Sequence, residues 1–298
     1  MDNQKKAYLF ALGAVLWWST VASAFKLSLR FLTPVELLLY ASVVSTVVLG
    51  AVLTARGRLG EAFAGGWPSF RPSLLFGFLN PFLYYLVLFQ AYELLPAQEA
   101  QPLNYTWAIT LTLLSIPLLR QRISRQEIAA IIVSYLGVVV ISTQGHLLHL
   151  HFANPLGVAL ALGSTVIWAL YWIFNSRDTR DPVTGLFLNF LCGLPFILAY
   201  ALATGALHRP ALPGLLGAAY VGVFEMGITY VLWLQALKLS VNTAKVGNLI
   251  FLSPFLSLIF IHLLVGERIL PSTYSGLVLI VAGLVLQRLR RRPRPASS

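Results

Sequence analysis

The sequence has little charge and almost no cysteine. Charged residues make up 10% of its 298 residues and apolar residues 58%, with a mean hydropathy of +0.78. A soluble domain is about a quarter charged, so this chain has too few charges to cover a globular surface in water. Cys192 is its one cysteine, which excludes a disulfide within the chain.

The apolar residues occur in long runs. A run of roughly 18 or more predicts a transmembrane helix. The chain therefore predicts an all-α integral membrane fold with ten spans, at about 7–27, 34–54, 72–93, 98–119, 126–144, 155–175, 183–204, 213–237, 243–265 and 272–289. The first run imitates a cleavable signal, but it holds Trp17 and Trp18 and recurs in the second half, so we expect it to remain as a helix.

The placement of basic residues predicts an orientation. If the N-terminus lies in the cytoplasm, the cytoplasmic segments hold 17 of the 21 Lys and Arg residues. The outer segments hold only Lys26, Arg30, Arg209 and Arg268. Positive residues favour cytoplasmic loops, so both termini are expected there. The net charge of +11 and the tail RLRRRPRP would also fit a nucleic-acid patch, but the alternation favours contacts with anionic lipid.

Two pairs of segments indicate that the chain is built twice. ALGAVLWW from Ala11 matches ALGSTVIW from Ala161, and RISRQEIAAIIVSYLGVVVI from Arg122 aligns with RILPSTYSGLVLIVAGLVLQ from Arg268, at offsets of 150 and 146 residues. Each unit has five helices, an odd number, so the second unit enters the membrane inverted. The sequence predicts two inverted five-helix repeats, 1–150 and 151–298, the second with a basic cytoplasmic tail. A binding site is expected between them near the membrane midplane.

The second unit ends in SPFLSLIFIHLLVGERILPSTYSGLVLIVAGLVL, with Pro254, Gly266-Glu267-Arg268, Gly276 and Gly283. Together with the two inverted units, this pattern resembles EamA-type members of the drug/metabolite transporter superfamily over nearly the whole chain. The first half departs from it, with Gln121 in the place of Glu267. The resemblance implies secondary transport by alternating access in a bacterial inner membrane.

The length and the aromatic-rich centre are similar to the aromatic amino acid exporters of that superfamily. This similarity implies export of aromatic amino acids. Drugs, other amino acids, nucleosides and other metabolites remain open as substrates. Two complete halves are enough for one pathway, so a monomer suffices.

Polar and aromatic side chains at helical spacing inside the spans are candidates to line a cavity. Rings suit an aromatic or cationic substrate, while amides and hydroxyls would hold its ammonium and carboxylate. The candidate substrate-binding residues are Trp17, Asn80, Tyr84, Tyr105, Trp107, Trp168 and Asn248. Helix packing is the alternative role for the tryptophans, and the sequence does not decide between Trp17 and Trp18. Residues near span ends, including Trp67 and Trp233, are assigned to the interfacial belt.

Glu225 is the acidic residue nearest the middle of a span. Because an intramembrane carboxylate costs at least about 2.5 kcal/mol, Glu225 is predicted to be a coupling site or a cation contact. The alternative is a structural pair with a Tyr or Lys. Pro81 and Pro254 lie within spans of opposite halves and are predicted hinges. Glu267 is expected to cap or tether a loop, and Gly276 and Gly283 to allow close helix packing.

Other function classes have little support. The chain has no HExxH or GxSxG motif and no paired carboxylates deep in the spans, so an enzyme is not expected. His146, His149 and His151 could bind zinc, but a spacer loop is favoured, and neither a metal nor a cofactor is expected. A membrane-embedded enzyme and a non-transporting scaffold remain the alternatives from other classes.

Overall fold

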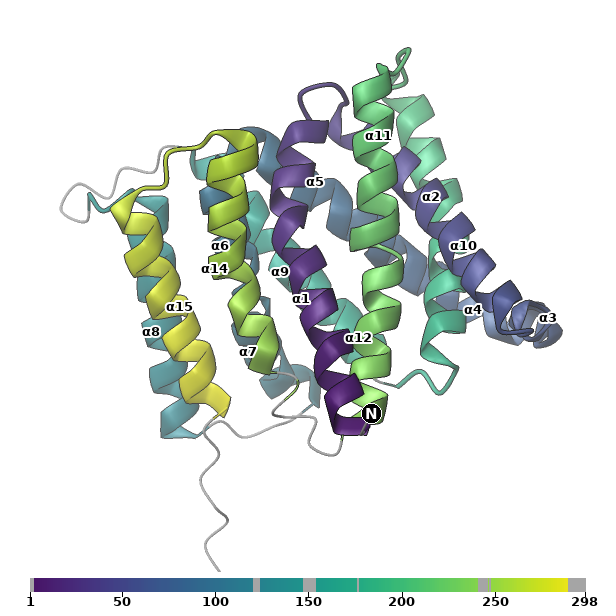
Figure 1. Ribbon diagram of the computed structural model, residues 1–298, viewed down its shortest axis with the longest axis horizontal. Helices are drawn as coiled ribbons and strands as arrows, with labels where there is room; N and C mark the ends of the chain where they lie inside the picture. The colour runs from purple at the N-terminus through teal and green to yellow at the C-terminus, as the bar shows by residue number, and fades with distance from the viewer. Residues whose placement is uncertain are drawn as a thin grey trace, which may run out of the picture.

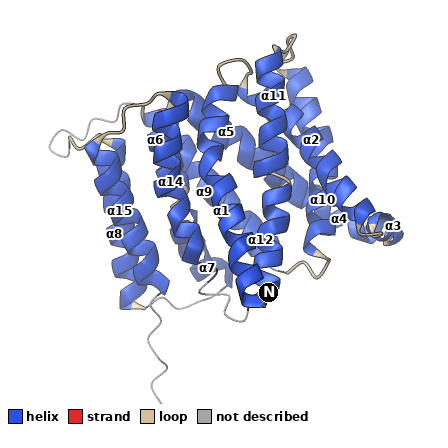
Figure 2. Ribbon diagram, in the orientation of Figure 1, coloured by secondary structure: helices blue, strands red, loops and turns tan. Residues whose placement is uncertain are grey.

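The protein is described by a computed structural model over residues 3–119, 124–146, 154–175, 177–240, 246 and 248–288. The regular structure of these ranges is helical throughout (Figure 2). The helices are α1 (Asn3–Ser28), α2 (Pro34–Ala55), α3 (Leu59–Ala64), α4 (Gly66–Gly77), η1 (Phe78–Leu83), α5 (Tyr84–Leu94), α6 (Ala97–Asn104), α7 (Trp107–Leu119), α8 (Arg125–Ser142), α9 (Pro155–Asn175), α10 (Pro182–Ala203), α11 (Leu212–Tyr220), η2 (Val221–Glu225), α12 (Ile228–Leu239), η3 (Asn248–Leu252), α14 (Ser253–Phe260), η4 (Ile261–Val265) and α15 (Pro271–Arg288).

Most of these helices combine into segments that can cross a membrane. Within the described ranges, eight segments are long and apolar enough, namely Asn3–Ser28, Pro34–Ala55, Gly66–Leu94, Ala97–Leu119, Arg125–Ser142, Pro155–Asn175, Pro182–Ala203 and Leu212–Leu239. The last two expected spans are present as shorter apolar segments, Leu249–Val265 and Pro271–Leu286. The prediction of an all-α, multi-pass membrane architecture is confirmed.

Several helices begin at caps that are readable in the sequence. Thr33 and Glu36 form a capping box at the start of α2, and Ser124 and Glu127 form another at the start of α8. Asp181 accepts hydrogen bonds from two backbone N–H groups at the start of α10. These side chains satisfy N–H donors that have no partner within the helix.

The two halves of the chain are interleaved. The main helix contacts pair α1 with α12, α2 with α10, α5 with α9, α7 with α9 and α8 with α15, each joining a helix before residue 150 to one after it. Figure 1 shows α1 beginning, and α15 ending, at the lower end of the view. Packing of this kind places the interior of the bundle between the halves.

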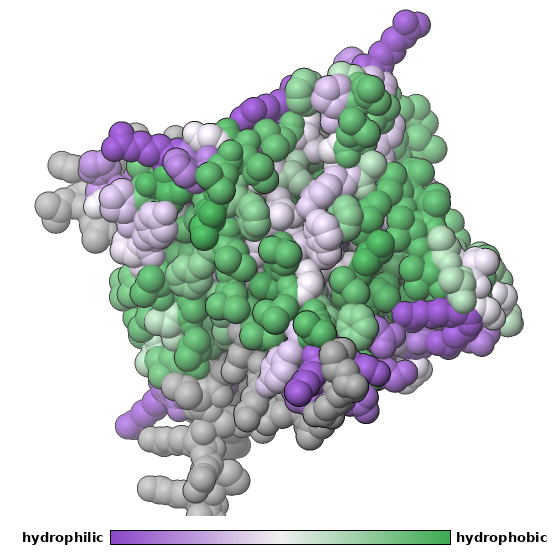
Figure 3. Space-filling view, in the orientation of Figure 1, coloured by the Kyte–Doolittle hydropathy of each residue, from purple (hydrophilic) through white to green (hydrophobic). Residues whose placement is uncertain are grey.

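The outer surface carries the apolar band of a membrane protein. Figure 3 shows a hydrophobic belt with hydrophilic residues gathered towards its two ends. Exposed apolar side chains recur at helical spacing, as in Leu9, Leu12 and Leu16 of α1 and in Ile132 and Leu136 of α8. In a soluble protein such stripes would be buried, whereas in a bilayer they contact lipid chains.

Helices α8 and α15 approach each other through glycines. A Cβ atom on Gly283 would lie 2.6 Å from the carbonyl oxygen of Ala130, and one on Gly276 would lie 2.7 Å from that of Gly137. The expected role of Gly276 and Gly283 in close packing therefore has a direct structural reason. Small residues let helix backbones meet, which favours association in lipid.

We expect Gly283→Ala to lower the free energy of unfolding in detergent by about 1–3 kcal/mol, because the methyl group overfills the contact between α8 and α15. The matched control is Gly163→Ala in α9, where a Cβ atom would meet nothing within 4 Å. The free energy of unfolding of that variant should rise by about 0.5–1 kcal/mol, because alanine has a higher helix propensity than glycine. Thermal unfolding of both variants checks the contrast, and equal shifts would contradict the packing argument.

Candidate functional site

Two membrane-crossing segments are broken near the middle of the bundle. Between α4 and α5, Asn80 has extended dihedral angles, with φ −147° and ψ 114°. Pro81 follows it, and proline both lacks an N–H and disfavours a helical residue before it. Between α11 and α12, the chain leaves the helix after Glu225, and Gly227 has φ −118° and ψ −100°. Pro81 and Gly227 are 146 residues apart, which is the offset that aligns Arg122 with Arg268. The two breaks therefore lie at corresponding positions of the two halves.

A second pair of breaks follows in the next segment of each half. In the first half, α6 ends before Tyr105 and Thr106, and α7 begins at Trp107. In the second half, a 3₁₀ turn, η3, leads into α14, with Pro254 in its first turn. Proline is tolerated at that position because the N–H it lacks would have no partner there. Discontinuous helices in corresponding positions of two repeats are typical of transporter binding sites.

A cavity of about 610 Å³ lies beside these breaks. Its walls come from both halves of the chain, and mostly from α1, α5, α6, α7, α9 and α12. The lining residues are Trp18, Val21, Ala22, Phe25, Tyr84, Leu88, Tyr92, Gln101, Asn104, Tyr105, Trp107, Leu111, Trp168, Trp172, Glu225, Tyr230, Trp233, Leu234, Leu237 and Ile250. This volume is suited to a small molecule.

Aromatic rings form one wall of the cavity. Trp168 lies 4.5 Å from Tyr84 and 6.0 Å from Trp172 between ring centroids, and Trp172 stacks on Trp107 at 6.5 Å. Three predicted site residues, Tyr84, Trp107 and Trp168, are thus brought together from α5, α7 and α9. Such a wall binds another ring by stacking, or a cation through the ring faces.

Hydrogen bonds between polar side chains hold this aromatic wall in place. The Tyr84 hydroxyl donates to Asn104 Oδ1 at 3.3 Å, and Asn104 Nδ2 donates to Ser164 Oγ at 3.0 Å. Tyr105, also predicted, lines the cavity and hydrogen-bonds Ser253. Asn104 and Ser164 therefore join α5, α6 and α9 around the cavity.

Glu225 brings a carboxyl group to the cavity at the break after η2. Its Oε1 atom accepts a hydrogen bond of 3.0 Å from the Tyr85 hydroxyl, and its side chain contributes to the lining. Tyr85 is fully buried, so the carboxyl group is held on one side by protein and open on the other. This geometry combines the two interpretations of Glu225, a tyrosine partner and a site facing the cavity.

The two adjacent tryptophans of α1 point in different directions. Trp18 lines the cavity and contacts Tyr230 and Trp233, with centroids 5.7 Å and 5.5 Å away. Trp17, predicted as a site residue, instead stacks on Phe224 at 4.1 Å, outside the lining. Trp233 lines the cavity and does not follow the expected assignment to an interfacial belt. Tyr230 and Trp233 are three residues apart on α12, a spacing that puts them on one face.

The remaining predicted residues lie away from the cavity lining. Asn80 is buried at its helix break beside Tyr171, and its Oδ1 atom has no hydrogen-bond partner in the part of the chain that the structure describes. Pro81 lies at the same break, and Pro254 is buried at the start of α14. The side chain of Asn248 lies outside the described residues, as do Lys245, His149, His151 and the basic tail from residue 289.

Glu267, in the connection between η4 and α15, ties the second half to α6. Its carboxylate accepts hydrogen bonds from the backbone N–H groups of Ala97 and Gln98, at 2.8 Å and 3.1 Å. The Gln98 side chain in turn bonds the backbone of Arg268 and Leu270. Glu267 thus caps α6, the helix that carries Asn104. The helix that Glu267 caps is α6, and nothing in the sequence identifies α6 as its partner.

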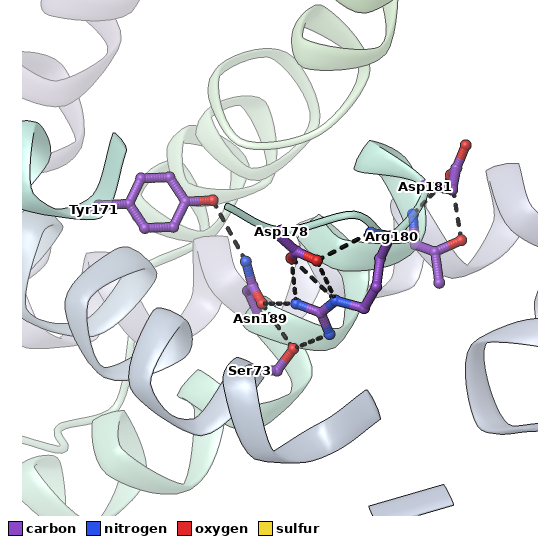
Figure 4. A network of polar contacts seen from close by, with 7 residues as sticks. Ser73, Tyr171, Asp178, Arg180, Asp181 and Asn189 are labelled. Carbon is purple, nitrogen blue, oxygen red and sulfur yellow. Dashed lines mark hydrogen bonds and ion pairs between the residues drawn. The ribbon is translucent and has the colours of Figure 1, made fainter. Parts of the chain in front are cut away.

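Elsewhere, a polar network holds the connection between α9 and α10 (Figure 4). Arg180 pairs with Asp178 at 2.6 Å and donates to Ser73 Oγ at 2.7 Å. Ser73 donates to Asn189, whose amide reaches the Tyr171 hydroxyl. Burial by itself would raise the pKa of Asp178, but the hydrogen bonds and charge of Arg180 outweigh it and hold that pKa below its ordinary value. The ion pair is therefore intact at neutral pH and is lost only as acid protonates Asp178.

This network ends next to the cavity. The ring of Tyr171 lies 5.5 Å from that of Trp168 and stacks on it. Ser73 belongs to α4 and Asn189 to α10, so the contacts connect both halves of the chain to the aromatic wall. Sequence reasoning missed this network, because an Arg and an Asp in a short loop give no sign of what they face.

We expect Glu267→Ala to lower the free energy of unfolding by about 1 kcal/mol, because α6 loses its cap. Substrate affinity should fall as well, since α6 carries Gln101, Asn104 and Tyr105. Glu127→Ala is the matched control: it removes a cap from α8, which does not line the cavity. Thermal unfolding and ligand titration of both variants check this. A Glu267→Ala variant with unchanged affinity would contradict the link between the cap and the site.

A model of the EamA-like transporter family matches residues 5–143 and again residues 155–288. The chain belongs to the EamA-like transporter family. It is thus a multi-pass membrane protein of a transporter family, and the resemblance predicted from its C-terminal motif is confirmed.

Relatives of this EamA-like protein support the assignment. It is 24% identical to an uncharacterized transporter of Archaeoglobus fulgidus over 95% of this chain and 98% of the relative. It is 26% identical to the aromatic amino acid exporter YddG of Ancylobacter novellus, over 97% and 99% of the two chains. A probable amino-acid metabolite efflux pump of Salmonella typhimurium is 29% identical over 58% of this chain and 62% of its own. A solved crystal structure shares the fold, with a TM-score of 0.66 and 23% identity over 96% of this chain and 99% of the other.

Proposed function

We propose that this protein is a secondary transporter that exports small amphipathic metabolites, with aromatic amino acids as its substrates, by alternating access. The observation that carries the proposal is the cavity between the halves, whose wall combines Tyr84, Trp107 and Trp168 with Glu225. The rings would hold an aromatic side chain, and the carboxylate would serve as a coupling site or cation contact. The relative from Ancylobacter novellus is named an aromatic amino acid exporter, which supports this substrate class.

The topology is part of the same proposal. The chain spans a bacterial inner membrane ten times, as two inverted five-helix halves at 1–150 and 151–298, with both termini and the basic tail in the cytoplasm. Three observations support this topology. With the N-terminus in the cytoplasm, 17 of the 21 basic residues lie in cytoplasmic segments. The helix breaks of the two halves correspond, and helices of one half pack against helices of the other. One copy contains the whole cavity, so a monomer is sufficient. Hinges at Pro81 and Pro254 would let one half move against the other.

Reconstitution into liposomes tests the proposal. Uptake of labelled tryptophan, phenylalanine, threonine and a nucleoside is compared in vesicles with and without the protein. We expect saturable flux of the two aromatic amino acids. Flux of threonine or of the nucleoside alone would reject the aromatic substrate class in favour of another metabolite exporter. No flux of any compound would reject transport.

A further inference from the structure

The charge of the cavity is one-sided. Among the described residues that line it, Glu225 is the only charged one. An aromatic amino acid brings both an ammonium and a carboxylate group into this space. The two groups have unequal counterparts: the ammonium has an ion partner, whereas the carboxylate meets rings, amides and hydroxyls.

One acceptor atom in the lining is available to a ligand. Glu225 uses Oε1 for the Tyr85 hydroxyl, and Oε2 has no hydrogen-bond partner among the described residues. This oxygen can accept hydrogen bonds from a ligand that donates them, as an ammonium group does.

The lining groups that could donate to a ligand carboxylate are neutral, namely tyrosine hydroxyls, side-chain amides and tryptophan N–H groups. Tyr84 donates to Asn104, and Tyr85 donates to Glu225. The amide of Asn104 donates to Ser164. Among the described residues of the lining, a ligand carboxylate would therefore pair with neutral donors, whereas a ligand ammonium pairs with the charged carboxylate of Glu225.

The carboxylate of Glu225 and the aromatic wall are adjacent. Tyr84 packs against Trp168 with the ring planes tilted by 30°, and the neighbouring Tyr85 donates the hydrogen bond to Glu225. The Tyr84 and Tyr85 rings themselves touch, with centroids 4.8 Å apart. A short amine with one ring can therefore reach the carboxylate and the ring wall at once.

From this arrangement we propose that the site recognises an aromatic ring and an ammonium group, and that it prefers aromatic monoamines to the corresponding zwitterionic amino acids. Glu225 binds the ammonium, and the ligand ring contacts the aromatic wall of the cavity, which includes Trp107, Trp168 and Trp172. The inference rests on the proposed function for the role of the cavity, and it extends the substrate class from aromatic amino acids to aromatic amines that lack a carboxylate.

Three ligands with the same ring and different charge test this preference at neutral pH. They are phenethylamine, a cation; phenylalanine, a zwitterion; and 3-phenylpropanoate, an anion. Binding to the full-length protein in detergent is followed by quenching of tryptophan fluorescence and by thermal shift. We expect the amine to bind most tightly and the anion at least about tenfold more weakly than the amine, with phenylalanine between them.

Variants assign the preference to its residue. In Glu225→Gln the affinities for the amine and the anion should come within about threefold of each other. Glu127→Gln, in the cap of α8, should keep the wild-type order. The inference is overturned if the anion or phenylalanine binds as tightly as the amine, or if Glu225→Gln keeps the order. Because binding is measured without flux, this failure is distinct from an absence of transport in liposomes.

Discussion

Glu225→Gln is expected to slow substrate flux in liposomes by about one to two orders of magnitude and to remove its response to a pH gradient. The carboxyl group stands at a helix break, held by Tyr85 on one side and open to the cavity on the other. It can take up a proton or pair with a cation, and glutamine can do neither. Hydrogen bonds to charged groups contribute about 1.5–3 kcal/mol, which corresponds to the stated loss.

The matched measurement is initial uptake with the pH equal on both sides and with an imposed gradient, for both wild type and variant. Glutamine has nearly the same shape and its oxygen still accepts from Tyr85, so thermal unfolding should change little. A variant that keeps the acceleration by the gradient would remove Glu225 as the coupling site. A wild type that ignores the gradient would indicate facilitated diffusion.

Trp168→Ala is expected to lower the affinity for an aromatic ligand by about tenfold, since ring stacking contributes about 0.5–1.5 kcal/mol beyond burial. Trp168 is the centre of the wall, in contact with Tyr84, Tyr171 and Trp172. Its loss also enlarges the cavity and frees its neighbours to move. The free energy of unfolding should fall by about 3 kcal/mol, which is the lower end of the range for truncating a buried tryptophan to alanine.

Two further variants separate binding from folding. Trp168→Phe keeps a ring at the site and should recover most of the affinity. Trp67→Ala removes a tryptophan of α4 that is 67% exposed, and should leave affinity unchanged. Fluorescence titration and thermal unfolding give both quantities for each variant. Equal affinities in Trp168→Ala and wild type would show that the ring wall is not the binding surface.

Much of the architecture follows from residue types alone. Apolar runs of spanning length and a lack of charge require a bilayer, because neither suits a surface in water. Capping boxes at Thr33 and Ser124 mark helix starts, since a local hydrogen bond needs only local sequence. Pro81 predicts the break at Asn80. The break after Glu225 has no proline, and only the offset between the halves relates it to the first one.

The direction in which each ring points is decided by tertiary structure. Trp17 and Trp18 are neighbours in sequence and about 100° apart around the helix, so choosing between them requires knowing what packs on α1. Helix α12 meets α1 so that Trp18 joins Trp233 in the cavity, while Trp17 stacks on Phe224. The partner of Glu267 is decided in the same way, because the N-terminus of α6 is 170 residues away along the chain.

By itself, the sequence determined that this protein is a helical membrane protein with a repeated plan and one carboxyl group deep in a span. These properties depend on composition, periodicity and spacing, and all three can be read directly from the amino-acid sequence. The tertiary structure decided which rings surround the cavity and that the carboxyl group of Glu225 faces it. Those depend on contacts between helices far apart in the chain, and such contacts arise only when the two halves pack together.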